Sequence, residues 1–75
     1  MSKIIVYSKD QCGYCVKAKA LLNSKSIEFK EININEKAEA FEYIVSQGHR
    51  SMPQIYIDDK SIGGYTELLK YIDSL

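Results

Sequence analysis

The sequence predicts an α/β fold in which a four-stranded mixed sheet is flanked by helices, with the element order β-α-β-α-β-β-α. Three observations support this prediction. Short runs rich in β-branched and aromatic residues alternate along the chain with segments of helical periodicity. A strand–helix–strand unit requires a parallel strand pair with a right-handed crossover. The last two strands are separated only by Asp58 and Asp59, and so short a turn requires an antiparallel pair.

Length and composition limit the classes of protein that the chain can represent. The 75 residues are expected to form one domain, residues 1–75, and a hydrophobic fraction of 45% excludes a disordered chain. Ten basic and ten acidic residues are interspersed, so nothing indicates nucleic acid or a membrane as a partner. The apolar run near the N-terminus is too short for a signal peptide or a membrane span. We therefore expect a monomeric cytoplasmic protein.

The first half of the chain contains two predicted strands and two predicted helices. Residues 3–7 form a buried strand, and residues 8–11 form a polar loop. A helix is expected from Tyr14 to about Asn23, and residues 27–32 alternate like a second strand. Asn33 and Glu36 resemble a capping box for a second helix that ends near Gln47, before Gly48. Its apolar side is expected to contain Ala38, Phe41, Ile44 and Val45.

The second half is predicted to form a hairpin and a final helix. Residues 54–57 and 60–62 are expected to be strands on either side of the Asp58–Asp59 turn. Gly63 and Gly64 interrupt the chain before the last helix. That helix is expected to direct four apolar side chains inward: Leu68, Leu69, Ile72 and Leu75. The whole arrangement resembles a minimal thioredoxin-like domain.

Both cysteines of the chain lie in one short motif, Cys12-Gly13-Tyr14-Cys15, at the predicted start of the first helix. The unpaired N–H groups and the positive end of the helix dipole stabilise a thiolate at that position. In CxxC motifs these effects lower the thiol pKa from about 8.5 to roughly 3.5–7.5. Cys15, one turn further along, should be more buried. We therefore expect Cys12 to attack a disulfide and Cys15 to resolve the resulting mixed disulfide.

Three other interpretations of the cysteines are weaker. Two inert core cysteines are disfavoured by their position at the start of a helix. A disulfide that closes so small a loop constrains the unfolded chain little, and a reducing compartment disfavours it. A tetrahedral zinc site needs four ligands, and the obvious candidates are Cys12, Cys15 and the distant His49. We expect His49 to be a surface residue and expect no metal.

Three separated motifs together resemble the glutaredoxin family over the whole chain. They are residues 7–15 with the CxxC pair, residues 50–57 beginning Arg50-Ser51-Met52-Pro53, and residues 62–68 containing Gly63-Gly64-Tyr65-Thr66-Glu67. The resemblance implies a cis peptide bond before Pro53, which lies against the active-site sulfurs. It also implies that the N–H and C=O groups of Met52 pair with a substrate peptide. The alternative is that Pro53 simply opens a strand.

The resemblance further implies that glutathione is the co-substrate. By matching positions, Lys9 and Arg50 bind its glycine carboxylate. The N–H groups of Tyr65 and Thr66 hold the γ-glutamyl carboxylate, as helix N-termini hold anions. Glu67 then faces the α-amino group. The remaining contacts are expected from Tyr14, which packs beside the sulfurs, and from Gly64, where a ligand approaches the backbone closely.

Each assignment has a simpler alternative. Lys9 and Arg50 fit ordinary solvated charges, Thr66 fits an N-cap, and Tyr14 fits a surface aromatic residue. Three positions depart from the family pattern. Gly13 stands where many members have proline, Met52 where valine is usual, and Glu67 where aspartate is commoner.

The resulting hypothesis is a glutathione-dependent thiol–disulfide oxidoreductase that acts on protein disulfides and on glutathionylated proteins. Two alternatives stay open. One is a redoxin that thioredoxin reductase reduces and that donates electrons to ribonucleotide reductase. The other is a glutathione-ligated carrier of a 2Fe-2S iron-sulfur cluster. The resemblance implies it because some family members with a small residue at the position of Gly13 share such a cluster across a dimer, held by Cys12-type thiolates and bound glutathione.

Overall fold

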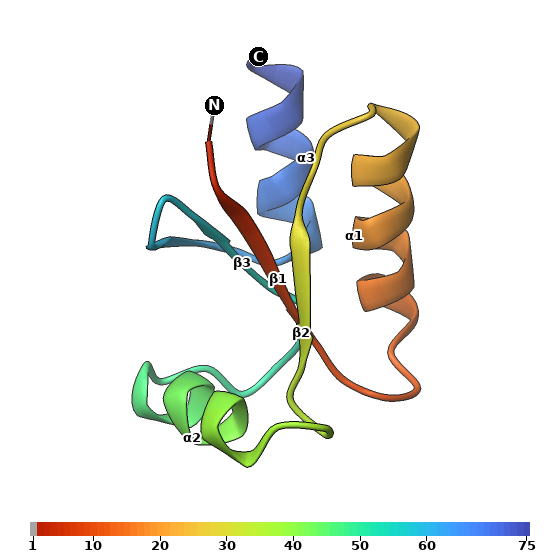
Figure 1. Ribbon diagram of the computed structural model, residues 1–75. Helices are drawn as coiled ribbons and strands as arrows, with labels where there is room; N and C mark the ends of the chain where they lie inside the picture. Colours follow the sequence, from red (N-terminus) through yellow and green to blue (C-terminus); the bar gives the residue numbers. More distant parts are fainter. Residues whose placement is uncertain (1) are drawn as a thin grey trace.

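The computed structural model describes residues 2–75, which form four strands and three helices in the predicted order (Figure 1). The strands are β1 (Ile4–Ser8), β2 (Lys30–Asn33), β3 (Gln54–Ile57) and β4 (Lys60–Gly63). The helices are α1 (Gly13–Ser24), α2 (Ala38–Ser46) and α3 (Tyr65–Asp73). Within residues 2–75, no helix is both long and apolar enough to cross a membrane.

The strands form one mixed sheet with the order β2-β1-β3-β4. β1 pairs in parallel with β2, and it pairs antiparallel with β3 on its other side. β3 and β4 form the predicted hairpin, and its turn residues Asp58 and Asp59 have φ of 50° and 69°. The prediction of a mixed sheet with one parallel pair and a terminal hairpin is therefore confirmed.

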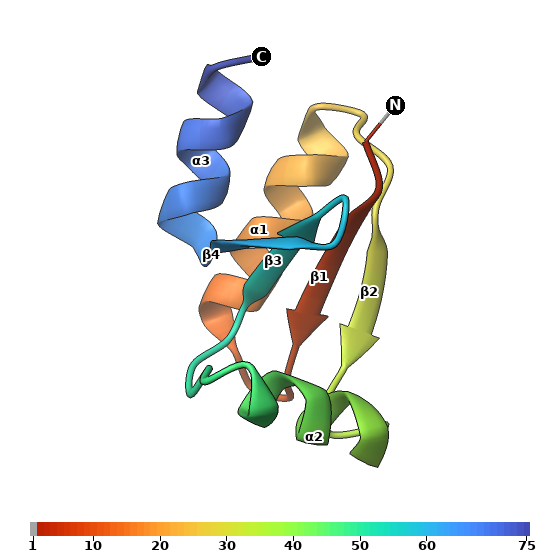
Figure 2. The same cartoon turned by 90° about the vertical axis from the view of Figure 1, so that its left-hand side faces the viewer.

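Two helices cover one face of the sheet. α1 and α3 lie on the same side, whereas α2 lies on the other side, near the C-terminal ends of β1 and β2 (Figures 1 and 2). Alternate residues of the central strands point toward α1 and α3 because side chains alternate across a strand. The main core is formed by Ile4, Val6, Ala18, Leu22, Ile55, Ile57 and Leu68.

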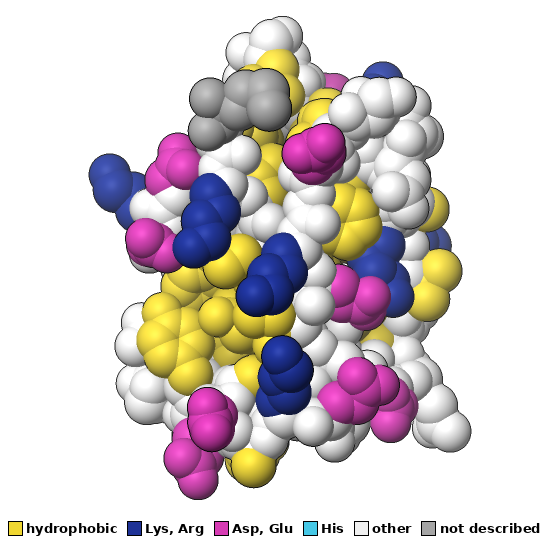
Figure 3. Space-filling model, viewed as in Figure 1, with side chains coloured by type: hydrophobic (Ala, Val, Ile, Leu, Met, Phe, Trp, Pro, Cys, Tyr) yellow, Lys and Arg dark blue, Asp and Glu magenta, His cyan; other side chains and the backbone are white. Residues whose placement is uncertain are grey.

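The opposite face contains a smaller, aromatic cluster. Tyr7 and Tyr56 pack edge to face with ring centroids 5.3 Å apart, and Ile44 of α2 covers them. Burial raises the pKa of both phenols. α2 covers this face only in part, and hydrophobic side chains remain visible at the surface there, with charged side chains around them (Figure 3).

The apolar side predicted for α2 is only partly correct. Ile44 is buried, but Phe41 and Val45 are 51% and 53% exposed, because α2 rests on one end of the sheet and not along its length. The predicted capping box is wrong: α2 begins after Lys37, which makes no side-chain cap. The Asn33 side chain instead donates to Asp10, so it stabilises the loop after β1.

Two further differences from the prediction concern β2 and the C-terminus. β2 begins at Lys30 instead of residue 27, because Ile27 and Phe29 pack against the main core before the chain joins the sheet. At the C-terminus, Leu68 is fully buried as expected, but Leu75 lies beyond α3 and is 75% exposed.

Candidate active site

The two cysteines lie at the N-terminus of α1, where the sequence predicts them. Cys12 is the N-cap residue, and its sulfur accepts a hydrogen bond of 3.1 Å from the N–H group of Cys15. The two cysteines are joined as a disulfide, with their Cα atoms 5.2 Å apart. Cys15 is 1% exposed and Cys12 is half-buried, so the expected difference in burial is present. A disulfide at this position is the oxidised form of a dithiol that can exchange with other thiols.

The backbone of Met52 lies beside the outer sulfur. The Met52–Pro53 peptide bond is cis, as the resemblance to the glutaredoxin family implies. The carbonyl oxygen of Met52 is 3.6 Å from the sulfur of Cys12. The loop before β3 is thus brought against the start of α1.

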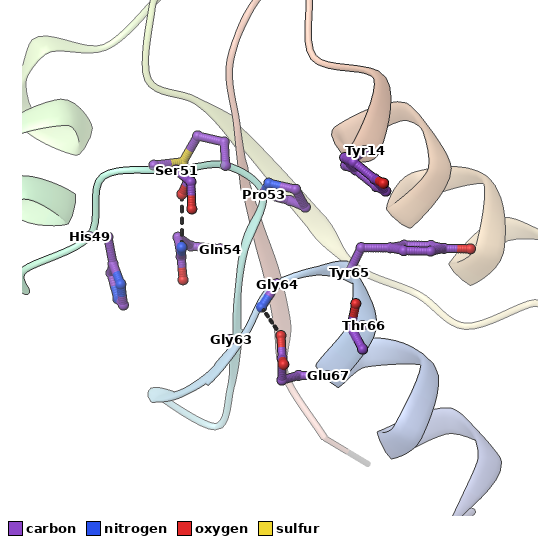
Figure 4. A pocket seen from close by; sticks show the side chains of 11 residues that line it. Tyr14, His49, Ser51, Pro53, Gln54, Gly63, Gly64, Tyr65, Thr66 and Glu67 are labelled. Atoms are coloured by element: carbon purple, nitrogen blue, oxygen red, sulfur yellow. Dashed lines mark hydrogen bonds between the residues drawn. The ribbon is translucent and has the colours of Figure 1, made fainter.

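A groove of about 610 Å³ opens next to this contact. Figure 4 shows Tyr14 and Tyr65 on one side of Pro53, and His49 and Gln54 on the other. The rings of Tyr14 and Tyr65 have centroids 5.9 Å apart, so α1 and α3 each contribute one aromatic side chain to the same wall. Tyr14 is 60% exposed, which leaves its ring available to a ligand.

The N-terminus of α3 forms another part of this groove. Gly64 is the N-cap, so the alternative in which Thr66 caps the helix is wrong. The N–H groups of the first turn have no acceptor within the helix, and they include those of Tyr65 and Thr66. Glu67 reaches back to accept a 2.8 Å hydrogen bond from the N–H of Gly64 (Figure 4).

Hydrogen bonds from the backbone N–H groups of Gly64 and of Glu67 itself hold the pKa of the Glu67 carboxyl below its ordinary value. Gly63 lies directly against this side chain. Its φ is +116°, and a Cβ atom there would be 2.6 Å from Cγ of Glu67. Position 63 therefore favours glycine for its backbone conformation, and a Cβ there would also displace the Glu67 side chain.

Lys9 and Arg50 do not line the same groove as α3. They line a second groove of about 410 Å³, between α2 and the loop after β1. His49 and Met52 line both grooves, so the two meet at the residue whose carbonyl contacts Cys12. The predicted site residues are thus divided between two adjoining grooves that share Met52.

Two residues of the first groove, His49 and Gln54, were misjudged or missed from the sequence. The ring of His49 is half-buried, with Nε2 3.1 Å from the Tyr56 hydroxyl, so His49 is not a free surface residue. Gln54 is buried and donates to the carbonyl of Ser51 (Figure 4). Oε1 of Gln54 is buried without a hydrogen-bond partner among residues 2–75. The strand alternation offered one signal, since Gln54 and Tyr56 share a face of β3.

No group of three or more His, Cys, Asp or Glu side chains within residues 2–75 is arranged to hold a metal ion. Both cysteines of the chain belong to the one CxxC pair. A 2Fe-2S cluster takes four ligands, and the cluster hypothesis takes them from Cys12 of two copies and from two bound glutathione molecules, so it stays a prediction.

A CxxC pair at a helix N-terminus, against a cis-proline loop of a thioredoxin-like sheet, defines the class of thiol–disulfide oxidoreductases. Comparisons with known proteins refine this assignment. The family model described as Glutaredoxin matches residues 4–62. Glutaredoxin 3 of Escherichia coli K12 is 41% identical over 69 residues, which cover 91% of this chain and 83% of the relative. The chain belongs to the glutaredoxin family.

Solved structures agree with this conclusion. Glutaredoxin 1 of Francisella tularensis, crystallised with cacodylate, matches with a TM-score of 0.80 and 33% identity, covering 99% of this chain and 95% of that one. NrdH-redoxin of Escherichia coli, a glutaredoxin-like protein with a thioredoxin-like activity profile, matches with a TM-score of 0.84 and 27% identity. That match covers 97% of this chain and 93% of the other.

Proposed function

We propose that this protein is a glutathione-dependent thiol–disulfide oxidoreductase. The observation that carries the proposal is the position of Cys12, where two features meet. Its sulfur accepts the N–H of Cys15 at the start of α1, and it lies beside Met52, at the edge of a groove that reaches the first turn of α3. A thiolate and an anion-binding helix N-terminus are then within reach of one small peptide ligand.

The reaction consists of exchanges in which one S–S bond forms as another breaks. The Cys12 thiolate attacks the glutathione sulfur of a mixed disulfide, and the substrate leaves as a thiolate. A second glutathione thiolate then attacks the Cys12–glutathione bond, which gives glutathione disulfide and restores the Cys12 thiolate. With a protein disulfide, Cys15 attacks the Cys12–protein bond, and two glutathione molecules later reduce the Cys12–Cys15 disulfide.

Glutathione binds across both grooves in this proposal. Its γ-glutamyl carboxylate takes the N–H groups of Tyr65 and Thr66, and its ammonium group faces the ionised Glu67. The cysteinyl backbone pairs with the N–H and C=O of Met52. The glycine carboxylate passes beyond Met52 to Lys9 and Arg50, which are exposed and line the second groove.

Serine replacements test the roles of the two sulfurs. Cys12→Ser should abolish the reduction of a glutathione mixed disulfide of cysteamine, whereas Cys15→Ser should retain it and lose only the reduction of protein disulfides. Activity of Cys12→Ser with the mixed disulfide, or its loss in Cys15→Ser, contradicts the assignment. Circular dichroism of both variants checks that the fold is intact.

A second candidate is a redoxin that thioredoxin reductase reduces and that supplies electrons to ribonucleotide reductase. The likeness to NrdH-redoxin, whose activity profile is thioredoxin-like, favours this candidate. The charged groups that suit the two ends of glutathione favour the glutathione-dependent oxidoreductase. The two candidates differ in their electron donor, so the donor is what an experiment must determine.

A further inference from the structure

We propose that the second groove is a docking groove for protein substrates. It binds the extended segment that follows the substrate's reactive cysteine, and it favours an apolar residue followed by an acidic one. This inference rests on the proposed function, because it places the substrate cysteine at Cys12. The groove is defined here by six lining residues: Lys9, Ile34, Phe41, Val45, Arg50 and Met52.

The groove has an apolar wall that the fold itself does not use. Phe41 and Val45 are 51% and 53% exposed and lie four positions apart on α2, so their side chains are neighbours on the helix surface. Ile34 and Met52 are half-buried and line the same groove. Large apolar side chains gathered in an exposed groove are a feature of binding surfaces.

The groove also carries a positive charge. Lys9 and Arg50 both line it and both are exposed. Within residues 2–75, the salt bridge present joins Lys19 and Glu31, so neither Lys9 nor Arg50 forms a salt bridge with a carboxylate of the described chain. An apolar wall beside two free cations is complementary to a segment with an apolar and an acidic side chain.

The groove is continuous with the reaction centre. Met52 lines it and also places its carbonyl oxygen 3.6 Å from the sulfur of Cys12. Glutathione ends one residue after its cysteine, and its glycine carboxylate reaches only the cations. A protein substrate continues, and each further extended residue adds about 3.3 Å. We place its second residue after the cysteine on the α2 wall and the acidic side chain of its third residue beside Lys9 and Arg50, which line the same groove.

The experiment compares substrates that share one leaving group, thionitrobenzoate, whose release is followed by absorbance. One is the mixed disulfide with glutathione. The other two are mixed disulfides with the capped peptides Cys-Gly-Leu-Glu and Cys-Gly-Ser-Ser. The reduced wild-type protein should react once with each substrate, and its second-order rate constant should be about tenfold higher for the Leu-Glu peptide than for the Ser-Ser peptide, as expected for one buried apolar side chain.

The double variant Phe41→Ser/Val45→Thr should remove most of this preference, with about a fivefold to tenfold loss on the Leu-Glu peptide. Its rate on the glutathione substrate should change by less than about twofold, because glutathione does not reach the α2 wall. Val16→Thr is the matched control: Val16 is 61% exposed on α1 and lines neither groove.

The outcomes separate this inference from the proposed function. Equal wild-type rates on the two peptides, or an equal loss on all three substrates in the double variant, overturn the docking groove. Dimerisation of the wild type that the double variant abolishes also overturns it, since a second copy would then be the occupant. If the wild type instead reacts no faster with the glutathione mixed disulfide than with the Ser-Ser peptide mixed disulfide, the proposed function is contradicted.

Discussion

The sulfur of Cys12 accepts a hydrogen bond from the N–H group of Cys15 at 3.1 Å. The same sulfur lies 3.6 Å from the carbonyl oxygen of Met52, which favours a protonated thiol. The two contacts have opposite effects on the pKa of the Cys12 thiol, because an N–H donor stabilises the thiolate and a carbonyl acceptor stabilises the thiol. If both contacts persist in the reduced protein, the N–H contact and the helix dipole stabilise negative charge on the sulfur, and we expect them to outweigh the carbonyl contact.

We expect this balance to make Cys12 reactive below neutral pH. In the reduced Cys15→Ser variant, iodoacetamide at pH 6 should alkylate Cys12 roughly tenfold faster than a cysteine in an unstructured peptide, because more of it is thiolate. Mass spectrometry of the quenched samples gives the rates. Equal rates for the protein and the peptide would show that the start of α1 does not stabilise the thiolate.

Glu67→Gln tests the cap at the start of α3. The variant keeps an acceptor for the N–H of Gly64 but loses the negative charge, so Tm at pH 7 should fall by about 2–4 °C. The pKa of Glu67 is lowered in the folded protein. Its stabilising effect is therefore present above the ordinary value of 4.5 and is lost as pH falls through the folded pKa. The Tm difference between wild type and variant should accordingly shrink in acid, and a constant difference from pH 7 to pH 2 would contradict this account.

Gly63→Ala should be more harmful than Gly48→Ala. Both positions have positive φ, +116° and +85°, so both variants place a Cβ in a disfavoured conformation. At Gly48 the Cβ meets nothing within 4 Å, whereas at Gly63 it displaces Glu67 from Gly64. Urea unfolding should show losses of about 1 kcal/mol for Gly48→Ala and about 2–3 kcal/mol for Gly63→Ala. Equal losses would mean that the contact with Glu67 contributes nothing.

Leu22 and Leu75 provide a matched pair for the core. Leu22 is fully buried and Leu75 is 75% exposed. Leu22→Ala should lower the free energy of unfolding by about 2–5 kcal/mol, and Leu75→Ala by less than about 0.5 kcal/mol. Urea unfolding measures both, and a large effect at Leu75 would show that the chain end packs in solution.

Features that depend on neighbouring residues were predictable from the sequence. The start of α1 at the CxxC motif, the hairpin turn at Asp58 and Asp59, and the cis bond before Pro53 follow from local patterns or from a family motif. The parallel pair of β1 and β2 follows from the general requirement for a right-handed crossover.

Features that depend on long-range contacts were not predictable from the sequence. Asn33 and Glu36 have the spacing of a capping box, but the Asn33 side chain donates to Asp10, in the loop after the neighbouring strand β1. The exposure of Phe41 depends on how α2 rests against the sheet, which helical periodicity alone does not determine. The division of the site into two grooves that meet at Met52 is likewise a tertiary property.

The central claim is that glutathione is the electron donor. The most direct test starts from the protein with its Cys12–Cys15 disulfide and measures the rate of reduction by glutathione and by thioredoxin reductase with NADPH. The proposal predicts rapid reduction by glutathione and little reduction by the reductase. Efficient reduction by thioredoxin reductase, with glutathione ineffective, would contradict it and would support the redoxin candidate.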